Sequence, residues 1–268
     1  MTDTFRLAHG TAPLLISMPH TGTFLPPDIA TRLTDAALRL PDTDWHMERL
    51  YDFTGALGVS LIAATHSRYV IDLNRPPDDA NLYPGQDTTG LCPVDTFRRE
   101  LLYLSGQQPD TAELQRRIGQ YWEPYHAALQ SELDRLLQLH RRVILWDAHS
   151  ICSVSPRFFD GRLPDLNFGS AGGSACDQSL AQRVLGIARS HPRYTSVLDG
   201  RFKGGYITRR YGQPHAGVHA IQLELAQITY MSEEYPYALD ESRVATLRPV
   251  LMELLEAVMQ TSLGLDNS

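Results

Sequence analysis

The sequence is poor in cysteine and has no long apolar run, and both absences exclude classes of protein. Its 268 residues include three cysteines, Cys92, Cys152 and Cys176, an odd number without C-x-x-C spacing. Such cysteines predict neither a disulfide framework nor a thiolate zinc knuckle, and are typical of reduced thiols in a cytoplasmic protein. No run approaches the ~20 apolar residues of a membrane span, and the N-terminal residues lack a basic segment followed by an apolar one. We therefore expect a cytoplasmic protein with no membrane partner.

Positively charged residues are fewer than negatively charged ones. The chain has 24 Lys and Arg against 31 Asp and Glu, which gives a net charge of -7 at pH 7. This balance argues against nucleic acid or an anionic membrane as a partner. The hydrophobic content of 43% and the charged content of 21% are ordinary for a soluble enzyme, and no internal repeat divides the chain. We expect a single domain over residues 1–268, present as a monomer or a small homo-oligomer.

A run of four apolar residues at positions 143–146, V-I-L-W, precedes the polar residues Asp147, His149 and Ser150. The run suits a strand buried on both faces of a parallel sheet. An apolar helix segment would give the same run, but its short length, the β-branched pair and Trp146 favour a strand. Ligands of open α/β sheets bind at the carboxyl ends of the strands. We therefore expect Asp147, His149 and Ser150 to leave this strand at the place where chemistry is done.

Strand-like and helix-like segments alternate along the rest of the chain. Further strands are expected at residues 13–18, 59–65, 69–73, 165–169 and 218–225. Helices are expected at residues 26–28, 34–38, 45–57, 110–140, 178–191 and 240–261, with Pro124 kinking or splitting the long one. Loops are expected at residues 78–93, whose length is typical of functional loops such as lids, and at the glycine- and arginine-rich residues 200–212. This alternation predicts a three-layer α/β sandwich with a mixed, mostly parallel twisted sheet.

Polar residues at or near the ends of these elements offer the ligands of a metal site. His20, Asp44, His149 and Glu224 supply two imidazoles and two carboxylates. A catalytic zinc site takes three protein ligands of these types, keeps one position for water, and needs a free carboxylate to accept a proton. A structural interpretation stays open, because Asp44 suits the N-cap of the helix at 45–57 and a histidine after a strand is more often a cap than a ligand.

Glu224 is harder to explain structurally. It lies between Leu223 and Leu225 in an expected buried strand, so its carboxylate needs a partner or a function. Two rival functions also remain. A serine hydrolase would use Ser17 or Ser150, although neither lies in a G-x-S-x-G elbow. A non-catalytic binding protein for acidic metabolites would need arginines and no metal.

Six motifs, taken in their order, resemble those of the N-formylglutamate deformylase family, also called N-formylglutamate amidohydrolase. They are S-M-P-H-T-G, D-T-D-W-H-M-E-R-L-Y, S-R-Y-V-I-D-L-N-R-P-P, W-D-A-H-S-I, G-G-Y-I-T-R-R-Y-G and H-A-I-Q-L-E-L. The resemblance extends from about His20 to Glu224. It implies a fold similar to that of the zinc carboxypeptidases and the aspartoacylase group. It also implies hydrolysis of N-formyl-L-glutamate to formate and glutamate, at the end of a histidine-degradation route.

The resemblance implies a Zn²⁺ ion, or another divalent transition metal, bound by His20, Asp44 and His149. Thr23 stands where the carboxypeptidases have the glutamate of their H-x-x-E pair. Asp44 is therefore the expected acidic ligand, with Glu48 as its competitor. Glu224 resembles the general base of the wider superfamily.

The resemblance also implies which residues bind the substrate. They are Arg68, Asn74, Arg75, Tyr206 and Arg209, with Arg75 also stabilising the oxyanion. The run D-L-N-R at residues 72–75 resembles the substrate-binding D-x-N-R of the aspartoacylase group, and the planar fork of arginine matches a carboxylate. A small acidic molecule is thus the expected partner. The alternative is a related zinc amidohydrolase that acts on another N-acyl acidic amino acid.

Overall fold

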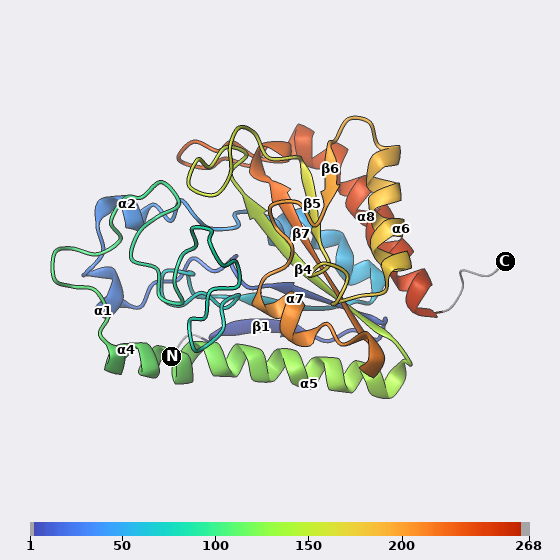
Figure 1. Ribbon diagram of the computed structural model, residues 1–268, viewed down its shortest axis with the longest axis horizontal. Helices are drawn as coiled ribbons and strands as arrows, with labels where there is room; N and C mark the ends of the chain where they lie inside the picture. Colours follow the sequence, from blue (N-terminus) through green and yellow to red (C-terminus); the bar gives the residue numbers. More distant parts are fainter. Residues whose placement is uncertain (1–2, 264–268) are drawn as a thin grey trace.

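The computed structural model describes residues 3–263, which are organised around a mixed sheet of seven strands (Figure 1). Residues 1–2 and 264–268, which the expected domain includes, lie outside the described part. The strands are β1 (Phe5–Ala8), β2 (Leu14–Met18), β3 (Ser60–Ala64), β4 (Val143–Ile151), β5 (Leu166–Gly169), β6 (Ser196–Leu198) and β7 (Val218–Ala226). Their order in the sheet is β1-β3-β2-β4-β7-β5-β6. Four of the six pairings are parallel, whereas β1 with β3 and β5 with β7 are antiparallel, so the mixed, mostly parallel sheet is confirmed.

Helices cover both faces of this sheet. The α-helices are α1 (Pro27–Ala30), α2 (Asp35–Leu38), α3 (Met47–Leu50), α4 (Thr111–Arg117), α5 (Glu123–Leu139), α6 (Gln178–Ser190), α7 (Tyr206–Tyr211) and α8 (Glu241–Leu263). The 3-10 segments are η1 (Asp52–Leu57), η3 (Pro214–Ala216) and η4 (Gln227–Thr229), and a π-helical segment, η2 (Ile118–Trp122), joins α4 to α5. In Figure 1, α4 and α5 run along one face and α6 and α8 along the other, which confirms the three-layer sandwich. No helix within residues 3–263 is both long and apolar enough to cross a membrane.

The alternation of side chains along each strand divides the apolar core into two halves. In β2, Ile16 packs in the core that α6 and α8 close, whereas Leu15 packs in the core beneath α5. Trp146 and Leu145 of β4 divide in the same way. Successive side chains of a strand point to opposite faces, so a strand covered on both faces is apolar throughout. This explains the unbroken apolar runs of the two strands.

β4 is longer than the sequence indicated. It pairs with β7 over its whole length, from Val143 to Ile151, so the polar residues do not leave the strand. Ala148 belongs to the core on the α8 side. Its neighbours Asp147 and His149 therefore point to the α5 side, and Ser150 points the other way. The predicted strand ends at Trp146, the last residue of the apolar run. Hydrophobic pattern alone does not reveal that the pairing of β4 with β7 continues through polar residues to Ile151.

Residues 69–73 do not form the predicted strand. They are buried but irregular, and their backbone groups bond to other parts of the chain. Nη1 of Arg117 donates to the carbonyl oxygens of Val70 (2.8 Å) and Tyr69 (3.4 Å). The amide of Asp72 donates to the carbonyl oxygen of Leu91 (2.7 Å). Buried backbone groups must be paired somewhere, and here side chains and a loop replace a strand partner.

The single helix predicted at residues 45–57 is also wrong. The segment contains the short α3 followed by η1, and α3 begins only after His46, whose φ of 62° is left-handed. A residue in that conformation does not continue a right-handed helix. Asp44 is therefore not a helix cap, and its carboxylate points toward His149 and Ser150 instead.

Three more elements differ from the prediction. α7 lies within residues 200–212, which were expected to form a loop, and the short strands β1 and β6 occupy residues that gave no strand signal. β1 is an edge strand whose residues are exposed or half-buried, so it shows none of the apolar character of the central strands.

The remaining predicted elements are confirmed within two residues at each end. Pro124 lies in the first turn of α5, directly after the π-helical segment, so the long helix is indeed divided near this proline. Residues 78–93 contain neither helix nor strand, as expected.

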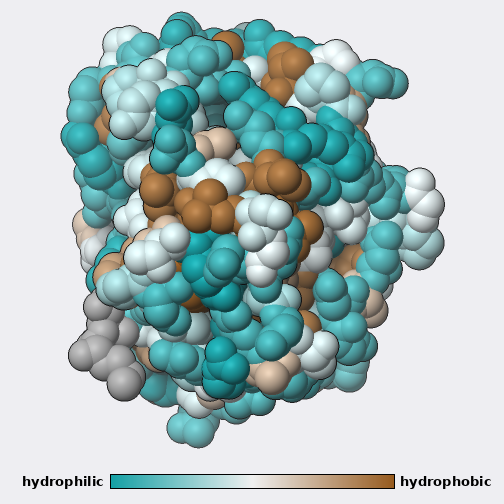
Figure 2. All heavy atoms as spheres, turned by 90° about the vertical axis from the view of Figure 1, so that its left-hand side faces the viewer, coloured by the Kyte–Doolittle hydropathy of each residue, from teal (hydrophilic) through white to brown (hydrophobic). Residues whose placement is uncertain are grey.

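The end of the molecule that carries α1 and α2 is built from short helices and long loops (Figure 1). Figure 2 shows this end face on: its surface is mostly hydrophilic, with a small group of apolar residues near the centre. A small exposed group of apolar side chains is normal on a folded protein. This surface therefore does not by itself mark a binding site.

The buried contacts of Arg117 generate a prediction about stability. Arg117→Met would leave the carbonyl oxygens of Tyr69 and Val70 with only long contacts at 3.5 Å, from the Tyr103 hydroxyl and the Cys92 thiol respectively. A poorly satisfied buried acceptor costs ~1–3 kcal/mol. We expect the free energy of unfolding in urea to fall by about 2–4 kcal/mol. Arg116→Met, on the exposed side of the same helical turn, should stay within about 0.5 kcal/mol of the original protein. Equal small changes in both variants would show that the segment at 69–73 does not depend on Arg117.

Candidate active site

The side chains of His20, Asp44 and His149 meet at the α5 side of the sheet. His20 lies just after β2, Asp44 lies between α2 and α3, and His149 lies in β4. One ligand atom from each residue lies within 4.8 Å of the others. Oδ2 of Asp44 is 3.2 Å from Nδ1 of His149 and 3.8 Å from Nδ1 of His20. The structure thus brings together the three residues that the sequence indicated as metal ligands.

Each of these histidines also has a carboxylate at its other ring nitrogen. Nε2 of His20 is 2.7 Å from Oδ1 of Asp72, and Nε2 of His149 is 3.1 Å from Oδ1 of Asp147. Metal-binding histidines commonly have such a partner, which orients the ring and raises its basicity. Here the partners leave both Nδ1 atoms directed toward Asp44.

The carboxylates around the two imidazoles outnumber the positive charges. Burial, reinforced by Asp44 and Asp147, raises the pKa of Glu224 to about 8. Burial opposes the charged form of His149, but Asp147 and Asp44 outweigh it and hold the pKa of His149 well above its usual value. The carboxylates thus cause the pKa shift of His149, whereas burial is the main cause of the shift of Glu224. A divalent cation would supply the missing charge.

The donor atoms fit such a cation. Oδ1 of Asp44 is buried and has no hydrogen-bond partner within residues 3–263, although buried polar atoms are normally paired. Two imidazole nitrogens and one carboxylate are the ligand types of a catalytic zinc site, and they also suit other transition metals. The competing acidic residue, Glu48, lies at the surface and forms an ion pair with Arg6 of β1. Asp44, and not Glu48, is therefore the carboxylate that lies together with His20 and His149.

A cleft of about 660 Å³, a volume that includes its open mouth, leads to this centre. His20, His149 and Glu224 line the cleft together with Arg75 and Arg201. In the β4–β7 ladder Glu224 stands directly beside His149. Because facing residues of paired strands point to the same side, the carboxylate of Glu224 and the imidazole of His149 share one wall.

Asn74 connects the cleft wall to the metal centre. Its Nδ2 lies 2.9 Å from Nε2 of His149 and 3.5 Å from Oδ2 of Asp147. Its Oδ1 accepts a hydrogen bond from the amide of Ile207 at the start of α7 (2.8 Å). The backbone donor fixes which way the amide group faces, so Nδ2 lies toward His149 and Asp147. When Nε2 of His149 carries the proton that faces Asp147, Nδ2 donates to Oδ2 of Asp147 and only packs against the ring of His149.

Two of the arginines that line the cleft form no ion pair within the described residues. Arg75 donates from Nη2 to Oγ1 of Thr89 (3.3 Å). Arg201 donates from Nε to the carbonyl oxygen of Phe158 (2.5 Å). Arg68, by contrast, is buried and donates to Oδ2 of Asp72 (2.6 Å). Two guanidinium groups are therefore available to an anionic ligand, and sequence reasoning had not singled out Arg201.

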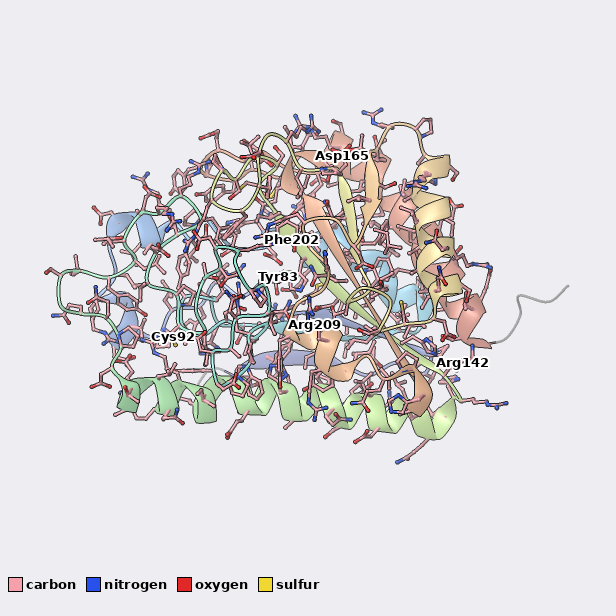
Figure 3. The ribbon with its side chains drawn as sticks, in the orientation of Figure 1. Tyr83, Cys92, Arg142, Asp165, Phe202 and Arg209 are labelled. Carbon is pink, nitrogen blue, oxygen red and sulfur yellow. The ribbon has the colours of Figure 1, made fainter. Side chains whose placement is uncertain are left out.

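Two of the predicted substrate-binding residues lie outside the cleft. Arg209 is exposed, donates to the carbonyl oxygen of Gly204 (2.8 Å), and has its guanidinium 5.3 Å from the ring centre of Tyr83 (Figure 3). Tyr206 packs against Trp122, with ring centres 5.6 Å apart. Both belong to α7, and neither lines the cleft. The segment was predicted to be a loop, whereas in α7 Arg209 packs over Tyr83, which lines the cleft, and Tyr206 packs on Trp122.

The serines considered as nucleophiles have no catalytic base. Oγ of Ser150 accepts a hydrogen bond from the hydroxyl of Tyr230 (2.7 Å), and Oγ of Ser17 lies 3.0 Å from the hydroxyl of Tyr125. No histidine within residues 3–263 bonds to either serine. A serine nucleophile needs an adjacent base, so the geometry argues against a serine hydrolase.

Comparison with known proteins gives consistent matches over most of the chain. The family model described as N-formylglutamate amidohydrolase matches residues 12–231. A Pseudomonas aeruginosa protein named N-formylglutamate deformylase is 49% identical over 259 residues, or 97% of each chain. A Pseudomonas putida protein of the same name is 50% identical over 250 residues, or 93% of each chain. The crystal structure of N-formylglutamate amidohydrolase from Ralstonia eutropha JMP134 is similar with a TM-score of 0.80 and 28% identity, over 97% of this chain and 98% of that chain.

The geometry of the three ligands generates a prediction about metal binding. His20→Ala should weaken Zn²⁺ binding by more than about 100-fold, because loss of a direct ligand costs more than the ~10–100-fold typical of a neighbouring partner. Calorimetric titration with Zn²⁺ measures the change. His191→Ala is the matched control, since His191 ends α6 and pairs with Glu253 far from the cleft. Full Zn²⁺ affinity in His20→Ala would exclude His20 as a ligand.

Proposed function

The chain belongs to the N-formylglutamate amidohydrolase family, and we propose that it hydrolyses N-formyl-L-glutamate to formate and L-glutamate in the cleft beside His20, Asp44 and His149. The observation that carries this proposal is the pairing of a centre suited to a metal with two unpaired guanidinium groups in one cleft. N-formylglutamate has one amide to cleave and two carboxylates to bind. Arginine binds carboxylates through two parallel hydrogen bonds.

We propose that Zn²⁺ is the cofactor, held by His20, Asp44 and His149. When bound, such an ion supplies Lewis-acid chemistry that makes an amide carbonyl open to attack by water. Asp72 and Asp147 would keep the two imidazoles oriented through their Nε2 atoms.

Glu224 is the proposed proton carrier. It lines the cleft and stands beside His149 in the neighbouring strand. Burial raises its pKa to about 8, and a carboxylate whose pKa lies nearer neutrality can both take and return a proton. In this mechanism Glu224 accepts a proton from the attacking water and delivers it to the nitrogen of the departing glutamate.

The arginines are proposed to bind the charged parts of the substrate. Arg75 lines the cleft together with His20 and His149, and its guanidinium interacts electrostatically with Asp72, the partner of His20. Arg75 stabilises the negative charge that develops on the formyl oxygen, and it also binds one carboxylate of the substrate. Arg201, held against Phe158, is assigned the other carboxylate.

A first prediction isolates Glu224. Glu224→Gln keeps the size of the side chain but cannot carry the proton, so kcat should fall by about 10²–10⁴-fold while Zn²⁺ affinity is retained. Initial rates of formate release, together with a Zn²⁺ titration, measure both properties. Glu48→Gln is the control, because this surface glutamate should leave rates unchanged. Near-normal turnover in Glu224→Gln would make its carboxylate structural.

A second prediction tests the substrate. Zn²⁺-loaded protein should release formate from N-formyl-L-glutamate and lose this activity on chelation. N-formyl-L-glutamine, which lacks the side-chain charge, should be a poorer substrate by about 10–100-fold, since each ~1.4 kcal/mol of lost binding to a guanidinium is tenfold. Arg201→Met should remove most of this preference, whereas Arg209→Met should retain it.

Three outcomes would count against the proposal. Equal kcat/KM for the acidic and amide substrates would refute recognition of the side-chain carboxylate. If Arg209→Met lost the preference for the acidic substrate and Arg201→Met kept it, Arg209 of α7 would be the residue that binds the side-chain carboxylate. A faster rate with N-acetyl-L-glutamate would identify an amidohydrolase for another N-acyl acidic amino acid.

A further inference from the structure

Residues 73–75 form an irregular segment that carries Asn74 and Arg75 to the cleft. Their three consecutive carbonyl oxygens each accept a hydrogen bond from a different element. Leu73 O accepts from Nε2 of His126 in α5 (2.9 Å), and Asn74 O accepts from the amide of Tyr206 at the start of α7 (3.2 Å). Arg75 O accepts from Nε1 of Trp122 in η2 (2.9 Å). Two of these three donors are side chains of the long helical segment.

The donor atom of His126 is determined by its surroundings. The carbonyl oxygen of Leu73 can only accept, so Nε2 carries the proton. Nδ1 lies 2.8 Å from the hydroxyl of Tyr211 and accepts from it. Burial lowers the pKa of His126 to about 4, which keeps the ring neutral and this arrangement unchanged near neutral pH. The ring of Trp122 stacks on that of His126 with centres 3.8 Å apart, so the two donors are held together.

The π-helical segment explains how one helix reaches the whole of this loop. Arg117 bonds to the carbonyls of Tyr69 and Val70, and Trp122, five residues later, bonds to that of Arg75. In an α-helix, residues three or four apart share a face, and residues five apart do not. η2 has i→i+5 geometry, which brings Arg117 and Trp122 onto the same side. π-helical turns of this kind are frequent at functional sites.

We propose that Trp122 and His126 are positioning residues that fix the backbone of residues 73–75, and so hold Asn74 against His149 and Arg75 in the cleft. Neither side chain lines the cleft, so each acts through the segment it bonds. The inference rests on the proposed function to the extent that Asn74 and Arg75 serve the reaction.

Trp122→Phe tests the proposal, because it removes the N–H donor and keeps an aromatic ring. We expect kcat/KM for N-formyl-L-glutamate to fall roughly tenfold, since a lost hydrogen bond to a buried acceptor has about that effect. Zn²⁺ affinity should be unchanged, because no metal ligand is touched. Tyr121→Phe is the matched control in the same turn: it also removes one polar atom, but that hydroxyl contacts none of these carbonyls, and activity should be retained.

Two further measurements separate positioning from a general loss of packing. In an Arg75→Met background, Trp122→Phe should lower kcat/KM by clearly less than tenfold, because only the positioning of Asn74 is then left to be lost. His126→Gln, which keeps an N–H donor, should recover most of the kcat/KM that His126→Leu loses. The same tenfold loss in both backgrounds, or equal losses in the two His126 variants, would overturn the proposal.

Hydrogen exchange gives a readout that does not depend on the reaction. The amides of Asn74 and Arg75, which bond to Asp72, should exchange faster in Trp122→Phe and at the original rate in Tyr121→Phe. Unchanged exchange in Trp122→Phe would refute the positioning role whatever the substrate. Faster exchange in a protein that does not release formate from N-formylglutamate would support positioning and refute the proposed function alone.

Discussion

Buried negative charge is the constraint on which the cleft depends. The carboxylates of Asp44, Asp72, Asp147 and Glu224 are all buried, and a buried carboxylate remains ionised only where opposite charge or hydrogen bonds compensate for lost water. Asp72 has Arg68 and His20, and Asp147 has His149 and the hydroxyl of Thr208. Asp44 and Asp147 each keep an Oδ1 atom without a hydrogen bond within the described residues, and Glu224 is left with a raised pKa. The remaining imbalance lies where the two imidazoles face Asp44, which is the place a cation would stabilise most.

The sheet gives this charged cluster its rigidity. Because side chains alternate along a strand, the stretch W-D-A-H of β4 directs Asp147 and His149 to one face while Trp146 and Ala148 anchor the strand in the opposite core. The ladder places Glu224 of β7 directly beside His149. The other contributors, His20, Asp44 and Asn74, come from segments after or between regular elements, and hydrogen bonds to side chains and amides hold them. Rigid strands therefore form one side of the centre, and irregular segments held by hydrogen bonds form the other.

The sequence was most informative where local pattern and final environment coincide. Apolar runs identified the central strands, and polar residues after or within these runs identified His20, His149 and Glu224. Features that depend on contacts between distant parts of the chain could not be predicted from the sequence. Because His46 has a left-handed conformation, the helix begins after it and Asp44 does not cap that helix. Residues 69–73 are buried beneath Arg117, and this burial gives them the apolar pattern of a strand. Arg201 and Arg209 look alike in sequence, and only the start of α7 decides that the first lines the cleft and the second does not.

The strand order has a consequence for how a newly made chain assembles. β7 lies between β4 and β5 in the sheet, although β5 and β6 precede it in the sequence (Figure 1). β5 and β6 therefore cannot take their final places until residues 218–226 have been synthesised and have paired with β4. Pairings between residues so far apart in the chain form slowly. Glu224 lies on the strand that fills this central gap, so the growing polypeptide has no complete cleft until β7 has paired with β4.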